Sequence, residues 1–257
     1  MDVNAYLDRI DIKPPTVADA AYLRELHRAH QNAVPFENLS IHLGERIKLG
    51  TDELFDKIVR RRRGGFCYEL NGLFAILLEQ LGYRVERLAA RVFGGERYGP
   101  PFDHLLLRVT TADGDGPWLV DVGFGSHSTY PLRFADRGEQ DDPGGRFRLA
   151  EAPDGDLELY KNGERVYRIE QRARELGEFW PTCWFQQTSP DSHFTRSDVC
   201  TRLDGDARIT ISGRKLIRTD RDGRVETPLG SDEEVLTAYR KEFGVVLDRV
   251  PAVASQE

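Results

Sequence analysis

The apolar residues of this 257-residue chain change their spacing at Gly82. Before that point they recur at helical intervals, as in residues 70–81. After it they alternate with polar residues over 84–93, 104–110 and 118–122. A period near 3.6 predicts amphipathic helices, and a period of two predicts strands with one buried face. The chain is therefore neither all-helical nor all-β, and we expect a helical part followed by an antiparallel sheet.

Three more helices are predicted before the change of period. Residues 3–10 carry apolar side chains on one helical face. Thr16 begins a sequence that resembles a capping box, ahead of a second helix that runs through His30. Thr51 is predicted to cap a third helix, with acidic residues in its first turn and the arginines of residues 60–63 at its end. The first third of the chain is therefore expected to be a helical bundle.

One cysteine stands where the last helix of this bundle begins. Gly64-Gly65 provide a tight turn, and Cys67 follows at the helix N-terminus. Unpaired N–H groups and the helix dipole favour an anion there, so we expect a lowered pKa for the Cys67 thiol. The structural alternative is a core thiol, because Cys67 shares a helical face with Leu70 and Phe74. The arginines before the turn are interpreted as solvated, except Arg63, which is nearest to the cysteine.

A hairpin is predicted across the turn sequence Asp113-Gly114-Asp115-Gly116. If Ala112 closes this turn opposite Pro117, the two residue numbers of every facing pair have the same odd sum. An even-numbered residue on one strand then faces an odd-numbered residue on the other. His104 and Asp121 then lie on the same face, near the same end of the hairpin. A single bulge would place them on opposite faces. The register thus predicts that a histidine and an aspartate are neighbours.

The rest of the chain continues with short strands. Alternating segments within residues 144–170 are separated by the turns Asp154-Gly155 and Asn162-Gly163, which indicates a small antiparallel barrel or sandwich. Residues 137–145 are polar and are predicted to form a surface loop. Further strands precede a helix over residues 231–243, so the last part is expected to be α+β.

Composition excludes several classes of protein. The formal charge of −7 argues against general affinity for nucleic acid. No apolar run approaches the roughly 20 residues of a membrane span, and the N-terminus does not resemble a signal peptide, so we expect a cytoplasmic protein without membrane contact. The cysteines, Cys67, Cys183 and Cys200, are odd in number and include no CxxC pair. This favours reduced thiols over disulfides and predicts no metal site.

Three residues together suit acyl transfer. That chemistry needs a thiolate, a base that moves protons, and a third group that orients the base. Cys67, His104 and Asp121 supply these groups, although each has a structural alternative when taken alone. The other five histidines lack such a combination and are predicted to be surface or core residues. The sequence Gly123-Phe124-Gly125-Ser126, directly after Asp121, is suited to bring backbone amides to a phosphate or pantetheine group.

Four segments of the chain carry a specific resemblance, namely residues 34–42 (VPFENLSIH), 63–72 (RGGFCYELNG), 104–107 (HLLL) and 120–125 (VDVGFG). Through them the chain resembles the arylamine N-acetyltransferases of bacteria. The segments occur in the family's order within the first 135 residues, and residues 131–133 (PLR) continue the match. In the last hundred residues the similarity is limited to Ser189-Pro190, His193-Phe194 and residues 239–243.

The resemblance implies an α+β fold in three parts around a Cys-His-Asp site like that of transglutaminases and papain. A helical bundle, residues 1–83, carries the nucleophile. An antiparallel β-barrel, residues 84–190, carries the histidine and the aspartate, and residues 191–257 form an α/β lid. Matched residue by residue, Cys67 is the acetylated nucleophile, His104 is the base and Asp121 is its orienting partner.

The resemblance also assigns residues around these three. Asn71 is expected to support Asp121. Arg63, which is part of the matched motif and is the arginine nearest to Cys67, is also expected to be a supporting residue of the site. The remaining matches are to substrate and coenzyme A contacts, namely Phe36, Phe124, Gly125, Ser126 and Phe194.

The implied reaction is a ping-pong acetyl transfer of the kind used in xenobiotic metabolism. Acetyl-CoA is the co-substrate, Cys67 holds the acetyl group, and the nitrogen of an arylamine, arylhydroxylamine or arylhydrazine receives it. Three alternatives stay open: an amide synthase that acts on a carrier-bound polyketide thioester, a cysteine protease or transglutaminase-like enzyme, and a binding module with a structural Cys67. The sequence names neither the physiological acceptor nor the oligomeric state.

Overall fold

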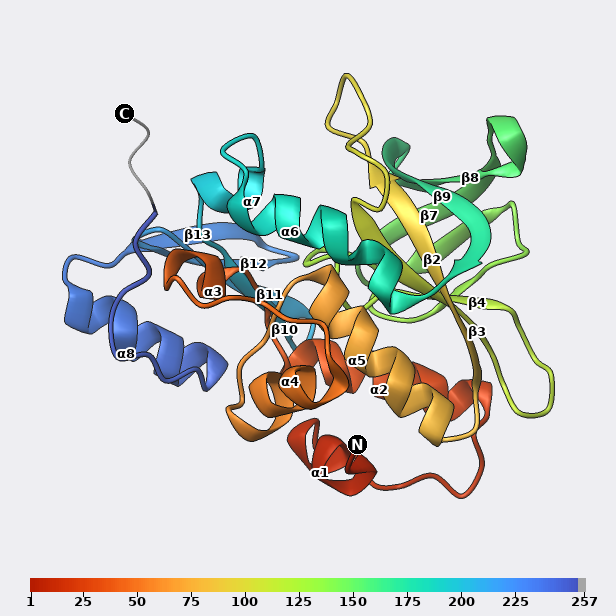
Figure 1. The fold of residues 1–257 in the computed structure, drawn as a ribbon, viewed down its shortest axis with the longest axis horizontal. Coiled ribbons are helices and arrows are strands. Elements are labelled where there is room, and N and C mark those ends of the chain that lie inside the picture. The colour runs from red at the N-terminus through yellow and green to blue at the C-terminus, as the bar shows by residue number, and fades with distance from the viewer. Residues whose placement is uncertain (254–257) are drawn as a thin grey trace.

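The computed structural model describes residues 1–253, and its first 80 residues are mostly helical, as the spacing predicts (Figure 1). α5 lies at the centre of this part and is buried along most of its length. Side chains of α1, α2 and α5 form one apolar core with residues of β3 and β4. The bounds are α1 Val3–Arg9, α2 Ala20–Ala33, α3 Leu39–His42, α4 Thr51–Phe55, a π-helical turn Asp56–Arg60, and α5 Cys67–Gln80.

Two predicted helix caps are wrong. Asp19, not Thr16, caps α2, because its carboxylate accepts a hydrogen bond from the Tyr22 N–H at 2.8 Å. Gly50 occupies the cap position of α4, and Thr51 is the first helical residue. The predicted cap of α2 lies too early and that of α4 one residue too late. Threonine, aspartate and glycine are all common at the cap position, and only the backbone path decides which of several neighbouring candidates occupies it.

The alternating segments after Gly82 form an eight-stranded antiparallel sheet in the order β5-β4-β3-β2-β9-β8-β7-β6. The sheet curls into a nearly closed barrel (Figure 1), and one cluster of buried apolar side chains lies within it. The strands are β2 Arg84–Val92, β3 His104–Thr110, β4 Trp118–Val120, β5 Leu132–Arg133, β6 Glu139–Asp142, β7 Gly145–Glu151, β8 Leu157–Lys161 and β9 Glu164–Arg174.

The prediction of a surface loop over residues 137–145 is wrong, because β6 lies within it and pairs with β7. β6 is the last strand of the sheet, and its residues Glu139–Asp142 are exposed or half-buried. The side chains of β6 are acidic or amide groups, so they do not alternate with apolar residues and give no strand signal in the sequence. This segment forms a strand because it pairs with β7.

In the hairpin of β3 and β4 the side chains lie on the faces predicted from the sequence, but the pairing register differs from the predicted one. Val109 pairs with Trp118 and Leu107 pairs with Val120, so the numbers of facing residues add up to an odd sum, as expected. The closing pair proposed from the sequence is wrong, because the Thr111 N–H bonds to the Asp115 carbonyl oxygen inside a longer turn. The register differs by two residues, and a shift of two leaves every side chain on its predicted face.

A second sheet, in the order β1-β10-β11-β12-β13, occupies the opposite end of the molecule from the barrel (Figure 1). Its first strand comes from the N-terminal part of the chain. α8 packs on this sheet, begins at the predicted cap Ser231 and ends at Gly244, while α6 and α7 connect the two sheets. The bounds are β1 Phe36–Glu37, α6 Trp180–Thr188, α7 His193–Arg196, β10 Cys200–Asp204, β11 Ala207–Ser212, β12 Lys215–Asp220, β13 Gly223–Pro228 and α8 Asp232–Phe243.

Candidate active site

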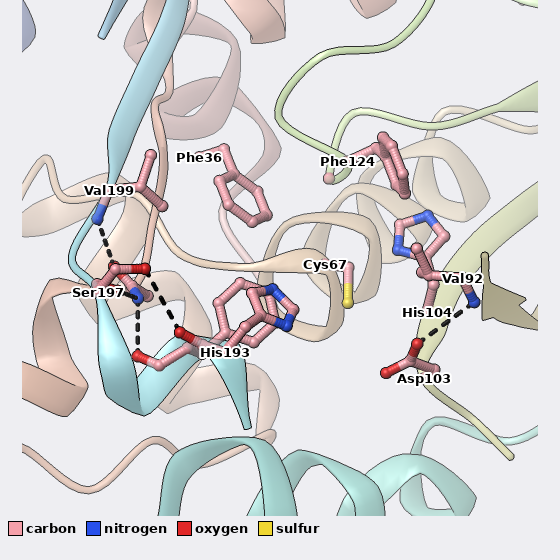
Figure 2. Close-up of a pocket in the computed structure, with 12 residues that line it drawn as sticks. Phe36, Cys67, Val92, Asp103, His104, Phe124, His193, Ser197 and Val199 are labelled. Atoms are coloured by element: carbon pink, nitrogen blue, oxygen red, sulfur yellow. Dashed lines mark hydrogen bonds between the residues drawn. The ribbon is translucent and has the colours of Figure 1, made fainter. Parts of the chain in front are cut away.

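Cys67 is the first residue of α5, and the turn before it needs glycine at two positions. A Cβ at Gly64 would lie 1.8 Å from the carbonyl oxygen of Pro35, and a Cβ at Gly65 would lie 2.6 Å from a carboxylate oxygen of Glu69. The absence of side chains lets the backbone pass closely between these groups. The chain thereby delivers the Cys67 side chain into a cavity, where Figure 2 shows the sulfur facing His104.

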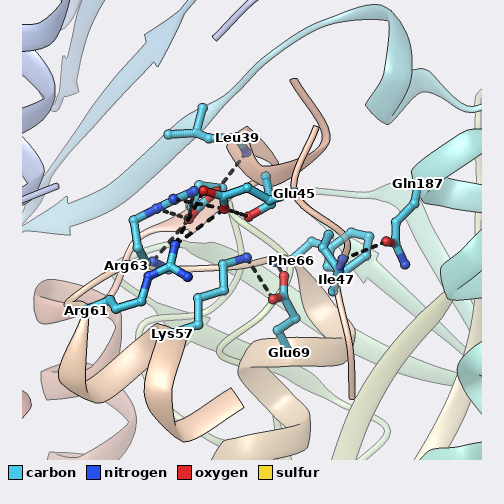
Figure 3. A network of polar contacts seen from close by, with 12 residues as sticks. Leu39, Glu45, Ile47, Lys57, Arg61, Arg63, Phe66, Glu69 and Gln187 are labelled. Atoms are coloured by element: carbon cyan, nitrogen blue, oxygen red, sulfur yellow. Dashed lines mark hydrogen bonds and ion pairs between the residues drawn. The ribbon is translucent and has the colours of Figure 1, made fainter. Parts of the chain in front are cut away.

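Two buried ion pairs hold this turn from behind (Figure 3). Arg63 pairs with Glu37 at 2.9 Å, and the Glu37 carboxylate also accepts a hydrogen bond from the Gly64 N–H at 3.3 Å. Lys57 pairs with Glu69 at 2.7 Å, and Glu69 also accepts a hydrogen bond from the Phe66 N–H. Arg63 is thus buried and bound to the turn, unlike the three exposed arginines before it.

His104 and Asp121 lie in contact. The Nε2 atom of His104 is 2.7 Å from Oδ2 of Asp121, and both side chains are buried. The other oxygen of Asp121 accepts hydrogen bonds from Asn71 Nδ2 at 2.9 Å and from the Gly123 N–H at 3.1 Å. Asn71 also accepts from the Val122 N–H, so it fixes the backbone that carries the carboxylate. The predicted neighbourhood of His104, Asp121 and Asn71 is therefore present.

The charges of this group follow from burial and from Asp121. Burial alone lowers the pKa of His104, but the charge and hydrogen bond of Asp121 outweigh it and raise the pKa to about 10. The same contact holds the pKa of Asp121 well below its usual range, against the effect of burial. Asp121 therefore stays ionised and makes the imidazole a strong base. With Nε2 bound to Asp121, the other ring nitrogen is left for Cys67, and Figure 2 shows it turned that way.

The expected fall in the pKa of the Cys67 thiol is wrong. Burial raises this pKa above its usual value, and the hydrogen bond and charge of His104 offset only part of the increase. The sequence places the cysteine at a helix N-terminus but does not show that the residue is 3% exposed, which removes water from the anion. The basic imidazole, more than the helix dipole, is what favours the thiolate here.

Two residues that contact Asp121, and a third that contacts one of them, were not identified from the sequence. The hydroxyl of Tyr167 donates a hydrogen bond to Asp121 Oδ2 at 3.2 Å, and His127 Nε2 lies 2.9 Å from that hydroxyl. His27 Nε2 accepts a hydrogen bond from the Asp121 N–H at 3.2 Å. Both histidines are buried, one of the two alternatives predicted for them. His27 lies in α2, Tyr167 in β9 and His127 in the loop after β4, so these contacts depend on how the three segments pack, and no spacing in the sequence reports that packing.

A cavity of about 200 Å³ lies over Cys67. Its walls include the aromatic rings of Phe36, Phe124 and Phe194, three of the five residues matched to substrate contacts. Figure 2 shows Phe36 and His193 on one side of the sulfur and Phe124 with His104 on the other. His193 was not selected from the sequence as a pocket residue. Gly125 and Ser126, also matched, do not line this cavity but border two neighbouring clefts.

Across residues 1–253, no cluster of three or more histidine, cysteine, aspartate or glutamate side chains is arranged to hold a metal ion. None of the helices in this range combines the length and the apolar character needed to cross a membrane.

Comparison with known proteins identifies relatives along nearly the whole chain. A family model described as N-acetyltransferase matches residues 19–252. The chain is 34% identical over 253 residues to the arylamine N-acetyltransferase of Mycobacterium tuberculosis, an alignment that covers 95% of this chain and 89% of that protein. It is 35% identical over 256 residues to the arylamine N-acetyltransferase of Mycolicibacterium smegmatis, with 96% and 93% covered.

Solved structures agree with these relatives. The arylamine N-acetyltransferase of Mycobacterium marinum superimposes with a TM-score of 0.88 at 36% identity, over 95% of this chain and 93% of that one. A second structure of the same enzyme, in complex with CoA, gives a TM-score of 0.87 at 35% identity, again over 95% and 93% of the two chains.

Proposed function

The chain belongs to the arylamine N-acetyltransferase family, a family of acyltransferases, and on that premise we propose that it transfers an acetyl group from acetyl-CoA to the nitrogen of an arylamine, arylhydroxylamine or arylhydrazine. We assign the roles of nucleophile, base and orienting group to Cys67, His104 and Asp121. The observation that carries this proposal is the arrangement of a buried cysteine and an Asp121-bound imidazole under an aromatic-walled cavity.

The first half-reaction acetylates Cys67. As the sulfur attacks the thioester carbonyl carbon, the thiol proton moves to the free ring nitrogen of His104, which Asp121 has made basic enough to take it. The carbonyl oxygen becomes an oxyanion, for which we propose the unpaired N–H groups at the N-terminus of α5 as hydrogen-bond donors. When the tetrahedral intermediate collapses, the bond to the CoA sulfur breaks, and the leaving thiolate takes the proton from His104.

The second half-reaction repeats these steps with the amine. An arylamine is largely uncharged near pH 7, so its nitrogen keeps the lone pair that attacks the acetyl-cysteine, and its ring suits a pocket walled by Phe36, Phe124 and Phe194. His104 takes the proton that the nitrogen loses, and Cys67 leaves as the thiol once that proton is returned. We further propose that residues 191–253 serve as a lid, because His193 and Phe194 close one side of the cavity. The predicted lid extends to residue 257, and residues 254–257 lie outside the described part of the chain.

Initial-rate kinetics test the proposal. With acetyl-CoA and an arylamine such as aniline varied together, a ping-pong enzyme gives parallel double-reciprocal lines, and CoA is released before the acceptor is added. Intersecting lines would mean that both substrates must be bound at once, and the covalent route would then be wrong. Peptide hydrolysis without acetyl transfer would favour the cysteine protease alternative.

A further inference from the structure

Asp103, the residue directly before His104, lines the cavity over Cys67. Among the lining residues, all of which belong to the described part of the chain, it carries the only carboxylate, and none is a lysine or an arginine. Asp103 also lines an adjoining cleft of about 610 Å³, which shares Val92 and His193 with the cavity. The carboxylate therefore lies where the aromatic cavity opens into the larger cleft, and the acetyl-transfer mechanism does not use it.

The Asp103 carboxylate is held in place by uncharged groups. Its Oδ2 atom accepts a hydrogen bond from the Val92 N–H at 3.3 Å, and Oδ1 accepts one from Gln186 Nε2 at 2.6 Å. Gln186 is itself fixed, because its amide oxygen accepts from the hydroxyl of Ser192, the residue that caps α7. Figure 2 shows one carboxylate oxygen bonded to Val92 and the other on the side that faces Cys67. The direction of the carboxylate is thus set by β2 and α6.

No cation of the described residues, 1–253, forms an ion pair with this carboxylate. Arg91, which lines the same cleft, donates its Nε–H to the Gly99 carbonyl oxygen at 2.9 Å instead. Burial raises the pKa of Asp103, although its two hydrogen bonds and the charge of His104 favour the ionised form. A half-buried carboxylate without a counter-ion bears a desolvation cost. A cation with N–H groups, bound in the cavity, would offset that cost.

We propose that Asp103 selects the acceptor by charge, favouring aromatic amines and hydrazines with a cationic, N–H-rich substituent over those with a carboxylate. This inference rests on the proposed function, because the aromatic amine is the substrate that the cavity over Cys67 would receive. An amidinium or guanidinium substituent suits the site best, since its planar pair of N–H groups matches the oxygens of a carboxylate. An aromatic acid would instead bring a second anion into a cavity that offers it no cation.

Asp103 takes no part in the chemical steps of this proposal. The base, His104, bonds through Nε2 to Asp121, and not to Asp103. The charges of Asp103 and His104 nevertheless favour each other's ionised forms, so removing the carboxylate would also make the imidazole a weaker base. A weaker base slows transfer to every acceptor alike. The ratio of two acceptors in one variant therefore reports selection by charge and is independent of this general loss.

Three acceptors of one shape test the selection. Near pH 7, p-aminobenzamidine is a cation, p-aminobenzamide is neutral and p-aminobenzoate is an anion. In Asp103→Asn, the ratio of kcat/KM for the amidine to that for the benzoate should fall by about tenfold to a hundredfold, as expected for loss of a charge-assisted hydrogen bond. The ratio for the amide should change least. Asparagine keeps the shape of the side chain and an oxygen that can accept from Val92.

Two further kinds of variant complete the comparison. Asp103→Ser removes the same charge with a smaller side chain, and it should lower the ratio as Asp103→Asn does. Glu96→Gln and Asp191→Asn are the matched controls, because these exposed acids line the adjoining cleft but not the cavity over Cys67. Exposed charges interact weakly with a ligand, so both controls should keep the wild-type ratio.

A binding measurement checks the site without turnover. Benzamidine, which has no amine to acetylate, should raise the melting temperature of the wild-type protein more than benzoate does at the same concentration, and Asp103→Asn should abolish the difference. An unchanged acceptor ratio in both Asp103 variants, an equal change in the Glu96 and Asp191 controls, or equal stabilisation by benzoate and benzamidine would overturn the proposal. If the wild-type protein acetylates none of the three acceptors, the proposed function has failed, whereas a benzamidine shift that depends on Asp103 would still support the cation site.

Discussion

The ion pair between Lys57 and Glu69 is expected to support the turn that presents Cys67, and removing the lysine tests this. The side chains are 11% and 2% exposed, and Nζ lies 2.7 Å from Oε1. In Lys57→Met the Glu69 carboxyl keeps its hydrogen bond from Phe66 but loses its counter-ion. Burial already raises the pKa of Glu69 in the intact protein, so in the variant this carboxyl should take up a proton.

The size of the effect follows from that proton. The unfolded chain ionises Glu69 near pH 4.3, so holding the folded state protonated costs about 1.4 kcal/mol for each pH unit above that value. The free energy of unfolding of Lys57→Met should therefore fall below that of the wild type by up to about 4 kcal/mol at pH 7, because the wild type, whose Glu69 pKa is also raised, already bears part of this cost. A loss of about 3–5 kcal/mol is typical of a broken buried pair. At pH 5 the loss should be at most about 1 kcal/mol.

Urea unfolding followed by tryptophan fluorescence at the two pH values measures these differences. Lys48→Met is the matched control, because Lys48 is 58% exposed and lies 3.6 Å from Glu53, and its loss should stay below about 1 kcal/mol. The double variant Lys57→Met/Glu69→Gln should recover most of the stability, since an amide carries no charge and its oxygen still accepts from Phe66. A loss that does not grow with pH, or one no larger than that of Lys48→Met, would refute this reasoning.

Three other predictions concern the site itself. Gly123→Ala should abolish acetyl transfer, because its Cβ would lie 2.8 Å from the Cα of Cys67, whereas Gly177→Ala, with no atom within 4 Å of its Cβ, should keep full activity in the same assay. Burial lowers the pKa of His127 to about 3, so between pH 6.5 and 3 only the unfolded chain protonates this ring. The free energy of unfolding should therefore fall by about 1.4 kcal/mol per pH unit on acidification in this range. Between pH 7 and pH 5, the urea midpoint of His127→Gln should fall less than that of the wild type. His104→Gln should slow alkylation of Cys67 by iodoacetamide at pH 6, because the imidazole lowers the thiol pKa; equal rates would mean that His104 does not activate the sulfur.

Local signals in the sequence predicted the parts of the fold that depend on neighbouring residues. The two glycines and the helical spacing located Cys67 at the start of α5, and the parity of the hairpin brought His104 and Asp121 to one face. The predicted faces are correct although the predicted closing pair is wrong, because a register shift of two residues leaves every side chain on the same face.

Contacts between distant segments were not predictable in the same way. β1 is two residues long and joins a sheet whose other strands begin at Cys200, and β6 is a polar strand made by its pairing with β7. Tyr167 reaches Asp121 across 46 positions of the sequence. Such contacts depend on packing between elements, and periodicity describes only one element at a time. The wrong sign for the pKa of Cys67 has the same origin, since burial is a property of the assembled fold.

Formation of an acetyl-cysteine on Cys67 is the step on which the proposed function depends. Intact-mass spectrometry after brief mixing with acetyl-CoA, without an acceptor, measures it directly. We expect a mass increase of one acetyl group that Cys67→Ala does not show and that an added arylamine removes. An unchanged mass in a protein whose Cys67 is still alkylated by iodoacetamide, or the same increase in Cys67→Ala, would contradict the assignment of Cys67 as the acetylated nucleophile.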